Sequence, residues 1–329
     1  MNIVFATSDL YANQAYITIF SLLEENIHME EINIYYVENG MTEQNKKKLQ
    51  KLVSQYKRSI EFISMREELK QISGLLRTNP VVYSYCYFQD ILPNNVDKVL
   101  MLESDTMVTN KLDDFYNIDI SDVYLAATDD LQSKWFKERL GINPNSPYFN
   151  SGVLLLNLKK MREDSISEKM TELITLGKSK YMYEVQDEMN ILFEGCVKIL
   201  PPKYNCTTSL FVFDYLDMKR YRKPSTCCSE EEFFEAINNP IVVHFTNNQI
   251  IQSRPWIENC DHPYCDRYNQ YKEKSILKNE KLWKSNRKIL NKIINYLYKN
   301  GFKSFIASSL GLIHAYFYPK ILYKYILKR

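Results

Sequence analysis

Two carboxylates follow a strongly apolar run, at a spacing that suits a cation site. Residues Val99–Leu102 are apolar over the length of a strand, which predicts a strand buried on both faces. Glu103 and Asp105 come directly after it, at positions i and i+2. Alternate residues of an extended chain point to the same side, so both carboxylates can converge on one hard divalent cation. An ordinary acidic turn after a strand would have the same residues.

Other polar residues also follow apolar, strand-like runs. They are Asp9, the pair Asp129 and Asp130, and His244. Each alone is typical of a helix cap, a turn or an ordinary histidine. On one parallel sheet, however, they would converge in the crevice at the carboxyl ends of the strands. Carboxylates and an imidazole suit Mn²⁺ or a similar ion and leave room for phosphate oxygens, which would help a diphosphate to depart.

The apolar pattern predicts strands and helices in alternation. We expect strands at 2–6, 32–37, 60–63, 99–102, 123–128, 153–156 and 241–243. We expect helices at 15–23, 42–56, 81–92, 159–176 and 186–193, with Thr42 as an N-cap. Such alternation predicts an α/β fold with a mainly parallel central sheet flanked by helices.

Composition excludes several classes of protein. The 329 residues include only 8 glycines, and neither GxGxxG nor GxxxxGK[ST] occurs, which disfavours dinucleotide-binding and P-loop folds. No run of 18 apolar residues and no secretory signal is present, so we expect a cytoplasmic chain with reduced thiols. Cys260, His262 and Cys265 do not match the paired CxxC spacing of zinc sites.

Charge is unevenly distributed along the chain. Residues 281–329 contain 11 Lys and Arg and no Asp or Glu, so 31 of the 42 basic and all 40 acidic residues lie in 1–280. We therefore predict a catalytic domain over 1–280 and a basic, aromatic, helical C-terminal segment over 281–329. The uncharged stretch 305–318 is too short to span a bilayer and suits an interfacial helix on an anionic membrane. A helical cap on the catalytic domain is the alternative, and the long apolar stretches argue against nucleic acid.

Four segments resemble a known family in order and spacing. They are Ile3–Ala12, Val99–Asp105, Phe149–Asn157, and Val243–Thr246 with Arg254–Trp256. Together they resemble the retaining glycosyltransferase family 8, which includes lipooligosaccharide galactosyltransferases. The resemblance implies the GT-A nucleotide-diphospho-sugar transferase fold over about residues 1–260.

The resemblance also implies roles for particular residues. Glu103, Asp105 and His244 match the metal ligands, and Ala6, Thr7, Asp9 and Tyr11 match the loop that holds uracil and ribose. The positions matching the sugar-facing and diphosphate-binding residues are Asp130, Asn150, Gln186, Asp187 and Arg254. Gln186 lies where the family places a polar group beneath the anomeric carbon. We expect Gln186, Asp187, Asp130 and Arg254 to act in catalysis.

The chain departs from the family pattern at four positions. Glu103 replaces an Asp, Tyr87 stands where an Arg often touches the donor, and Asn247 replaces a Gly. Arg254 replaces a Lys and supplies the same charge in a different geometry. These changes affect the expected sugar preference and metal geometry more than the reaction class.

The expected function is therefore metal-dependent, retaining transfer of galactose or glucose from a UDP-sugar, with Mn²⁺ or Mg²⁺. The acceptor would be a glycan or lipid-linked oligosaccharide of bacterial surface polysaccharide, lipooligosaccharide or glycoprotein assembly. The enzyme would be peripheral on the inner face of the cytoplasmic membrane. Two alternatives remain at this point: a nucleotidyltransferase, and a degenerate membrane-bound protein that binds sugar nucleotides without transferring them.

Overall fold

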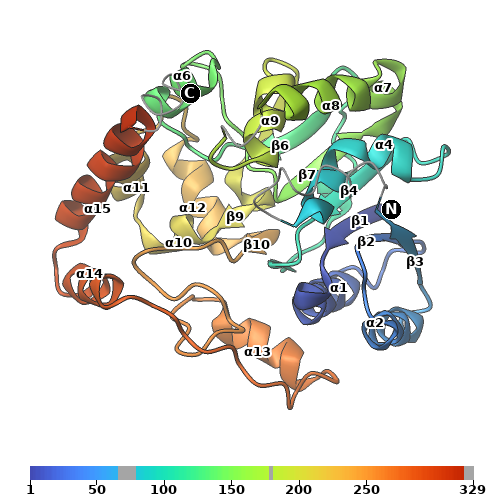
Figure 1. Cartoon of the computed structure of the whole chain (residues 1–329). Coiled ribbons are helices and arrows are strands. Elements are labelled where there is room, and N and C mark those ends of the chain that lie inside the picture. Colours follow the sequence, from blue (N-terminus) through green and yellow to red (C-terminus); the bar gives the residue numbers. More distant parts are fainter. Residues whose placement is uncertain (66–78, 178–180, 322–329) are drawn as a thin grey trace. The chain divides into compact units, whose positions relative to one another are not determined.

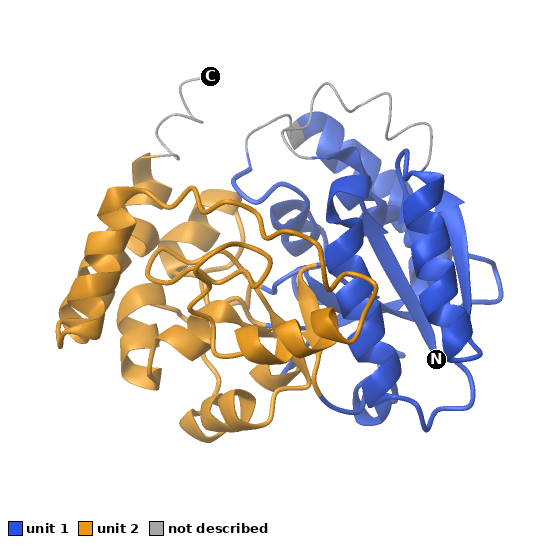
Figure 2. Cartoon of the chain, turned by 90° about the horizontal axis from the view of Figure 1, so that it is seen from below, with its two compact units in different colours: residues 1–104, 110–128, 149–200 blue, residues 105–109, 129–148, 201–329 orange. Residues whose placement is uncertain are grey.

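The computed structural model of the protein describes residues 1–65, 79–177 and 181–321, and these residues form two compact units. Unit 1 comprises residues 1–104, 110–128 and 149–200, drawn in blue in Figure 2. Unit 2 comprises 105–109, 129–148 and the chain from 201 on, drawn in orange. Because each unit combines separate segments of the chain, residues that are distant in sequence become neighbours in each of them.

Unit 1 is built on a seven-stranded sheet (Figure 1). Its order is β3-β2-β1-β4-β7-β6-β8. The strands are β1 (Asn2–Thr7), β2 (Asn33–Glu38), β3 (Ser59–Ser64), β4 (Lys98–Leu102), β6 (Leu125–Thr128), β7 (Val153–Asn157) and β8 (Val197–Leu200). Since β7 pairs antiparallel with both β4 and β6, while the other pairs are parallel, the six remaining strands run in one direction. The prediction of a mainly parallel sheet is confirmed.

Helices cover this sheet because its central strands are apolar on both faces. Val4 and Ala6 belong to a core cluster with η3, α8 and α9, whereas Ile3 and Phe5, which alternate with them, are fully buried outside it. The unit-1 helices are η1 (Asp9–Tyr11), α1 (Ala12–Glu25), α2 (Glu43–Gln55), η3 (Pro80–Tyr87), α4 (Phe88–Ile91), α5 (Asp113–Tyr116), α7 (Leu158–Glu163), α8 (Ile166–Gly177) and α9 (Val185–Leu192). Thr42 caps α2 as predicted, because its hydroxyl accepts a hydrogen bond from Asn45 N.

Two helices differ from the sequence prediction. The helix expected over 159–176 is divided into α7 and α8, and the break lies where Ser165 takes a left-handed φ of 49°. The α-helix expected over 81–92 is mostly the 3₁₀-helix η3, followed by the short α4. Val81, Val82 and the alternating tyrosines of η3 are weak α-helix formers, and their burial decides the local geometry.

Unit 2 contains a second, three-stranded sheet in the order β5-β10-β9. Its strands are β5 (Thr106–Val108), β9 (Cys206–Thr207) and β10 (Val242–His244). The expectation that His244 ends a strand of the main parallel sheet is therefore wrong, because β10 pairs antiparallel with β5 instead. The unit-2 helices are α6 (Lys134–Leu140), η4 (Pro202–Tyr204), α10 (Thr208–Val212), α11 (Tyr215–Arg222), α12 (Glu230–Asn238), α13 (Cys265–Glu273), α14 (Ile289–Lys299), α15 (Lys303–Gly311) and the π-helical η5 (Leu312–Phe317).

The C-terminal segment has a buried side and an exposed side. Tyr298, Ile306 and Leu310 belong to the hydrophobic core of unit 2. At Gly311 α15 meets α11 so closely that a Cβ would lie 2.1 Å from the Arg220 carbonyl oxygen. The large apolar side chains exposed in its described part are Leu282, Ile289, Leu290, Ile293, Tyr296, Phe302, Phe305, Leu312, Ile313, Phe317, Tyr318 and Ile321.

Residues 322–329 of the predicted tail lie outside the described residues. Within the described ranges, no helix has the length and apolar character needed to cross a bilayer. The functional division at residue 280 stays a prediction.

Candidate active site

Strand pairing brings Asp105 and His244 together within unit 2. His244 is the last residue of β10 and pairs with Thr106 of β5, next to Asp105. Phe245 N donates a hydrogen bond to the Asp105 carbonyl at 2.9 Å, which continues the ladder by one step. His244 Nε2 then lies 3.3 Å from Asp105 Oδ1.

Arg254 approaches the other oxygen of the same carboxylate. Its Nη2 lies 3.4 Å from Asp105 Oδ2. Burial alone would raise the pKa of Asp105, but the His244 and Arg254 charges outweigh it and hold that pKa below its usual value. Asp105 is therefore ionised at neutral pH. Arg254 Nε is buried without a hydrogen-bond partner among the described residues, so this guanidinium retains a donor for a ligand.

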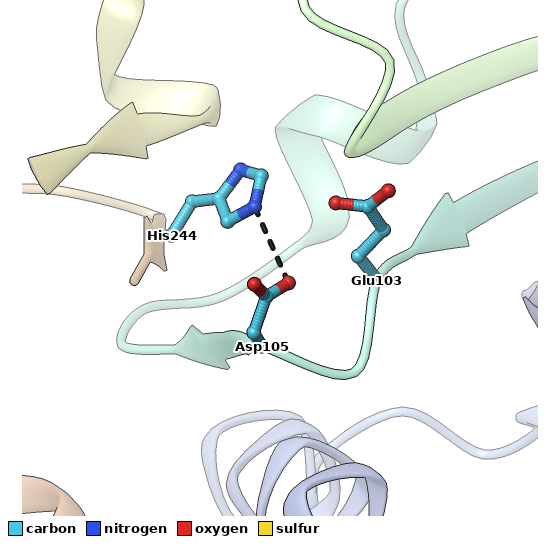
Figure 3. A group of neighbouring side chains, drawn as sticks. All are labelled: Glu103, Asp105 and His244. Carbon is cyan, nitrogen blue, oxygen red and sulfur yellow. Dashed lines mark ion pairs between the residues drawn. The ribbon is translucent and has the colours of Figure 1, made fainter. Parts of the chain in front are cut away.

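Glu103 completes a group of potential metal ligands (Figure 3). One ligand atom each from Glu103, Asp105 and His244 lie within 4.8 Å of one another. Glu103 N donates to the Gly152 carbonyl at 2.9 Å, and its Oε1 accepts a hydrogen bond from Tyr85 Oη at 3.2 Å. Two carboxylates and one imidazole are ligands that divalent metal ions use in proteins.

Asn205 holds the ring of His244 in a defined orientation. His244 Nδ1 lies 3.0 Å from Asn205 Oδ1, and because an amide oxygen only accepts hydrogen bonds, Nδ1 carries the proton. In the neutral ring, the form that ligates metal ions, Nε2 then carries the lone pair, and Nε2 is the nitrogen on the Asp105 side. Such a second partner commonly fixes the tautomer of a metal-binding histidine. The residues present therefore fit a divalent ion.

The carboxylate of Asp9 accepts hydrogen bonds from residues at the start of α2. Its Oδ1 accepts hydrogen bonds from Thr42 N at 2.9 Å, Thr42 Oγ1 at 3.0 Å and Asn45 Nδ2 at 2.8 Å. Burial opposes ionisation, but these donors together lower the pKa of Asp9. The other predicted residues of this loop lie at or just after β1: Ala6 and Thr7 are buried and Tyr11 is half-buried.

Gln186 and Asn190, one turn apart on α9, hold the Phe149–Gly152 turn. Gln186 Oε1 accepts from Ser151 N at 3.0 Å and from Ser151 Oγ at 3.3 Å. Asn190 accepts from Phe149 N at 2.7 Å and donates to the Phe149 carbonyl at 2.9 Å. Asn150 Oδ1 accepts from Gly152 N at 2.9 Å, so the structure brings Asn150 and Gln186 to one turn.

The carboxylate of Asp187 accepts hydrogen bonds from backbone N–H groups of unit 1. It is fully buried, and its Oδ2 accepts from Met182 N at 2.7 Å and Tyr183 N at 3.0 Å. The next residue, Glu188, is 3% exposed, and burial together with Asp187 and Glu184 raises its pKa to about 8. Glu188 is therefore mostly protonated at neutral pH.

Asp129 and Asp130 differ in their surroundings. Asp129 is a turn residue that accepts from Leu131 N at 2.9 Å and Thr226 Oγ1 at 2.6 Å, and burial raises its pKa. Asp130 accepts from Gln132 Nε2 at 2.8 Å and pairs with Arg222 at 3.7 Å. Asp129 therefore stabilises the turn after β6, which is what a carboxylate that follows a strand most often does.

The sequence prediction missed three residues that support this site. They are Asn205, Asn190 and Tyr85. Asn190 could have been found, because it lies four residues after Gln186 on a predicted helix and shares its face. No local signal distinguishes Asn205 or Tyr85.

Comparison with known proteins defines the class of the molecule. Residues 2–260 match glycosyl transferase family 8. The chain belongs to this family and is a glycosyltransferase, which confirms the resemblance seen in the sequence and sets aside the nucleotidyltransferase and non-enzymatic alternatives. Enzymes of this class use a nucleotide-sugar donor and a glycan acceptor.

Particular relatives extend this comparison. General stress protein A of Bacillus subtilis (strain 168) is 24% identical over 277 residues, which cover 82% of this chain and 92% of the relative. A lipopolysaccharide 1,2-glucosyltransferase of Escherichia coli is 27% identical over 62% of each chain. The solved structure of the galactosyltransferase LgtC with donor and acceptor sugar analogues aligns with a TM-score of 0.71 at 24% identity, over 84% of this chain and 96% of that one. At that identity the structural match shows the fold alone, which is the GT-A fold.

Proposed function

We propose that this enzyme is a metal-dependent, retaining hexosyltransferase that moves glucose or galactose from a UDP-sugar to a glycan acceptor. The observation that carries the proposal is the group of Glu103, Asp105 and His244, with Arg254 on the same Asp105 carboxylate. Two carboxylates, an imidazole with a defined tautomer and a guanidinium with an unused donor suit a metal-bound diphosphate.

In this proposal Glu103, Asp105 and His244 hold Mn²⁺ or Mg²⁺. The bound ion would offset the charge that builds on the diphosphate as the bond to the sugar breaks. Arg254 binds the same diphosphate, and its Nε and Nη atoms supply the fork of donors that phosphate oxygens accept.

The remaining predicted residues bind the donor. Ala6, Thr7, Asp9 and Tyr11 would hold uridine, and Asp130, Asn150 and Gln186 would face the sugar. Gln186 is fixed by Ser151 and therefore has a defined orientation. Asp187, whose Oδ2 binds two backbone amides, would contribute by holding the chain before α9 in place.

Hydrolysis of the donor tests the proposal. UDP-glucose, UDP-galactose and their N-acetyl forms are incubated with the enzyme in Mn²⁺, in Mg²⁺ and in EDTA, and UDP release is followed. We expect UDP to be released from one of the hexose donors, and to be released only when a metal ion is present. Release in EDTA at the same rate would contradict the metal assignment, and release from none of the four would contradict the donor class.

The acceptor is proposed to be lipid-linked and to lie at an anionic membrane surface, in lipopolysaccharide or other surface-polysaccharide assembly. The exposed apolar residues of α14, among them Ile289, Leu290 and Ile293, alternate with exposed lysines. Each basic residue near an anionic leaflet contributes about 1 kcal/mol of binding. The relative named as a lipopolysaccharide glucosyltransferase supports an acceptor of this kind.

Vesicle sedimentation tests the membrane proposal. Binding to anionic vesicles should exceed binding to neutral ones and weaken with salt, because exposed charges are screened over about 10 Å at 0.1 M. Ile289→Ser with Leu290→Ser should reduce it, whereas Leu216→Ser, an exposed leucine on α11, should not. Equal sedimentation with anionic and neutral vesicles would contradict the proposal.

A further inference from the structure

Arg254 lies on an irregular segment, residues 248–261, which we name the arginine loop. It contains neither helix nor strand apart from a one-residue bridge at Ile257. Trp256, on the same loop, packs edge-on against Phe245, next to His244. A loop without regular backbone hydrogen bonds of its own needs contacts with other segments to keep its conformation. Here residues beyond 280 contact both ends of the loop.

Trp283 holds the second half of the loop. Its N donates to the Trp256 carbonyl at 2.8 Å, and its carbonyl accepts from Glu258 N at 2.9 Å. This exchange fixes the backbone directly after Arg254.

Arg287 holds both ends of the loop at once. Its Nη2 donates to the carbonyls of Gln249, at 2.9 Å, and of Ile250. Its Nη1 lies 3.6 Å from Asp261 Oδ2, and the side chain is 10% exposed. Asp261 in turn donates its N–H to the Gln252 carbonyl at 2.8 Å. The rigid planar fork of an arginine presents its donors in fixed directions on two separate nitrogens, whereas the donors of a lysine all lie on one rotating ammonium group.

We propose that Arg287 is a positioning residue that keeps Arg254 in place for the donor diphosphate. The inference rests on the proposed role of Arg254. Without Arg287, two loop carbonyls and the Asp261 carboxylate lose their shared partner, so the loop shifts to regain hydrogen bonds. A displacement of about 1 Å at a catalytic group can reduce the rate about a hundredfold. Arg287 itself touches no reacting atom in this scheme.

A double-mutant cycle tests whether Arg287 acts through Arg254. Donor hydrolysis and Tm are measured for Arg254→Ala, Arg287→Ala and the double variant. We expect Arg287→Ala to lower kcat/KM at least about tenfold in the wild-type background and to have no further effect in the Arg254→Ala background. Its effect on Tm should be the same in both backgrounds, because folding does not depend on the donor. Independent, multiplicative losses of kcat/KM would overturn the proposal.

Binding measurements keep the test decisive where Arg287→Ala does not fold. Arg287→Lys retains the charge beside Asp261 but loses the fork, and the exposed neighbour Lys288→Ala is the matched control. With Mn²⁺ present, Arg287→Lys should weaken UDP binding several-fold and leave uridine binding unchanged. The control Lys288→Ala should bind both ligands like the wild type. Equal weakening of both ligands would show a general structural role. If Arg254→Ala itself binds UDP normally, the role proposed for Arg254 fails, whatever Arg287 does.

Discussion

Asp105 and Asp187 are both largely buried carboxylates, but they bind different kinds of partner. Asp105, with 16% of its side chain exposed, contacts two side chains, His244 and Arg254. Asp187 is fully buried and accepts hydrogen bonds from two backbone N–H groups. Side chains can turn toward a ligand, whereas backbone donors move only with the chain. The partner of a buried carboxylate, more than the burial itself, therefore decides whether the carboxylate is available for chemistry.

The largest expected effect is the loss of activity in Asp105→Ala. We expect transfer to fall at least about a hundredfold, the scale on which a lost charge-stabilising group slows an enzyme, with little change in Tm. Assays of UDP release and thermal melts of the same preparation measure both quantities. If Tm collapses together with activity, Asp105 is a structural residue like Asp187 and the contrast disappears.

Asn205→Ala should change the metal requirement without removing it. Loss of a second-layer hydrogen bond to a ligating histidine typically weakens metal binding about 10- to 100-fold. The Mn²⁺ concentration for half-maximal activity should rise accordingly, while kcat at saturating Mn²⁺ changes little. An unchanged Mn²⁺ titration would mean that Asn205 does not orient His244.

Asp187→Ala should have the opposite profile to Asp105→Ala. Two backbone N–H groups lose their acceptor, which costs about 1–3 kcal/mol for a buried group left unpaired. Tm should fall clearly, as calorimetry would show. A wild-type Tm with abolished activity would place Asp187 with Asp105, among the carboxylates that serve the donor.

The smallest effect concerns Glu188 and the pH dependence of stability. Its pKa is raised from 4.5 to about 8, so the native state keeps a proton that the unfolded chain releases above pH 4.5. Stability should therefore be lost as pH rises from about 4.5 to about 8. Glu188→Gln should raise Tm at pH 8 relative to the wild type and give no gain at pH 4.5. A gain of equal size at both pH values would show that this carboxyl does not titrate differently on folding.

Local pattern was sufficient for six of the seven strands of unit 1 and for the acidic turn. It missed β8, whose first three residues are partly or largely exposed and include Lys198. The runs around Val4, Met101 and Leu155 are buried on both faces, and such runs predict buried strands without further information. The break at Ser165 and the placement of β10 were not predictable in this way. A left-handed serine leaves no compositional signal, and β10 joins β5 through a pairing between residues more than a hundred positions apart. Asn205 and Arg287 were missed for the same reason, since each acts on a residue distant in sequence.

The pairing of β5 with β10 also has a consequence during synthesis of the chain. Thr106, Met107 and Val108 are all buried in the folded protein, but β10, which pairs with β5, is made much later. At roughly 5–20 residues per second, the delay is on the order of 10 s. During that interval a short apolar edge strand waits without its neighbour, a condition that favours misplaced pairing and aggregation. Asp105 directly precedes β5. The contact between Asp105 and His244 can therefore form only if β5 stays unpaired until His244 has been synthesised.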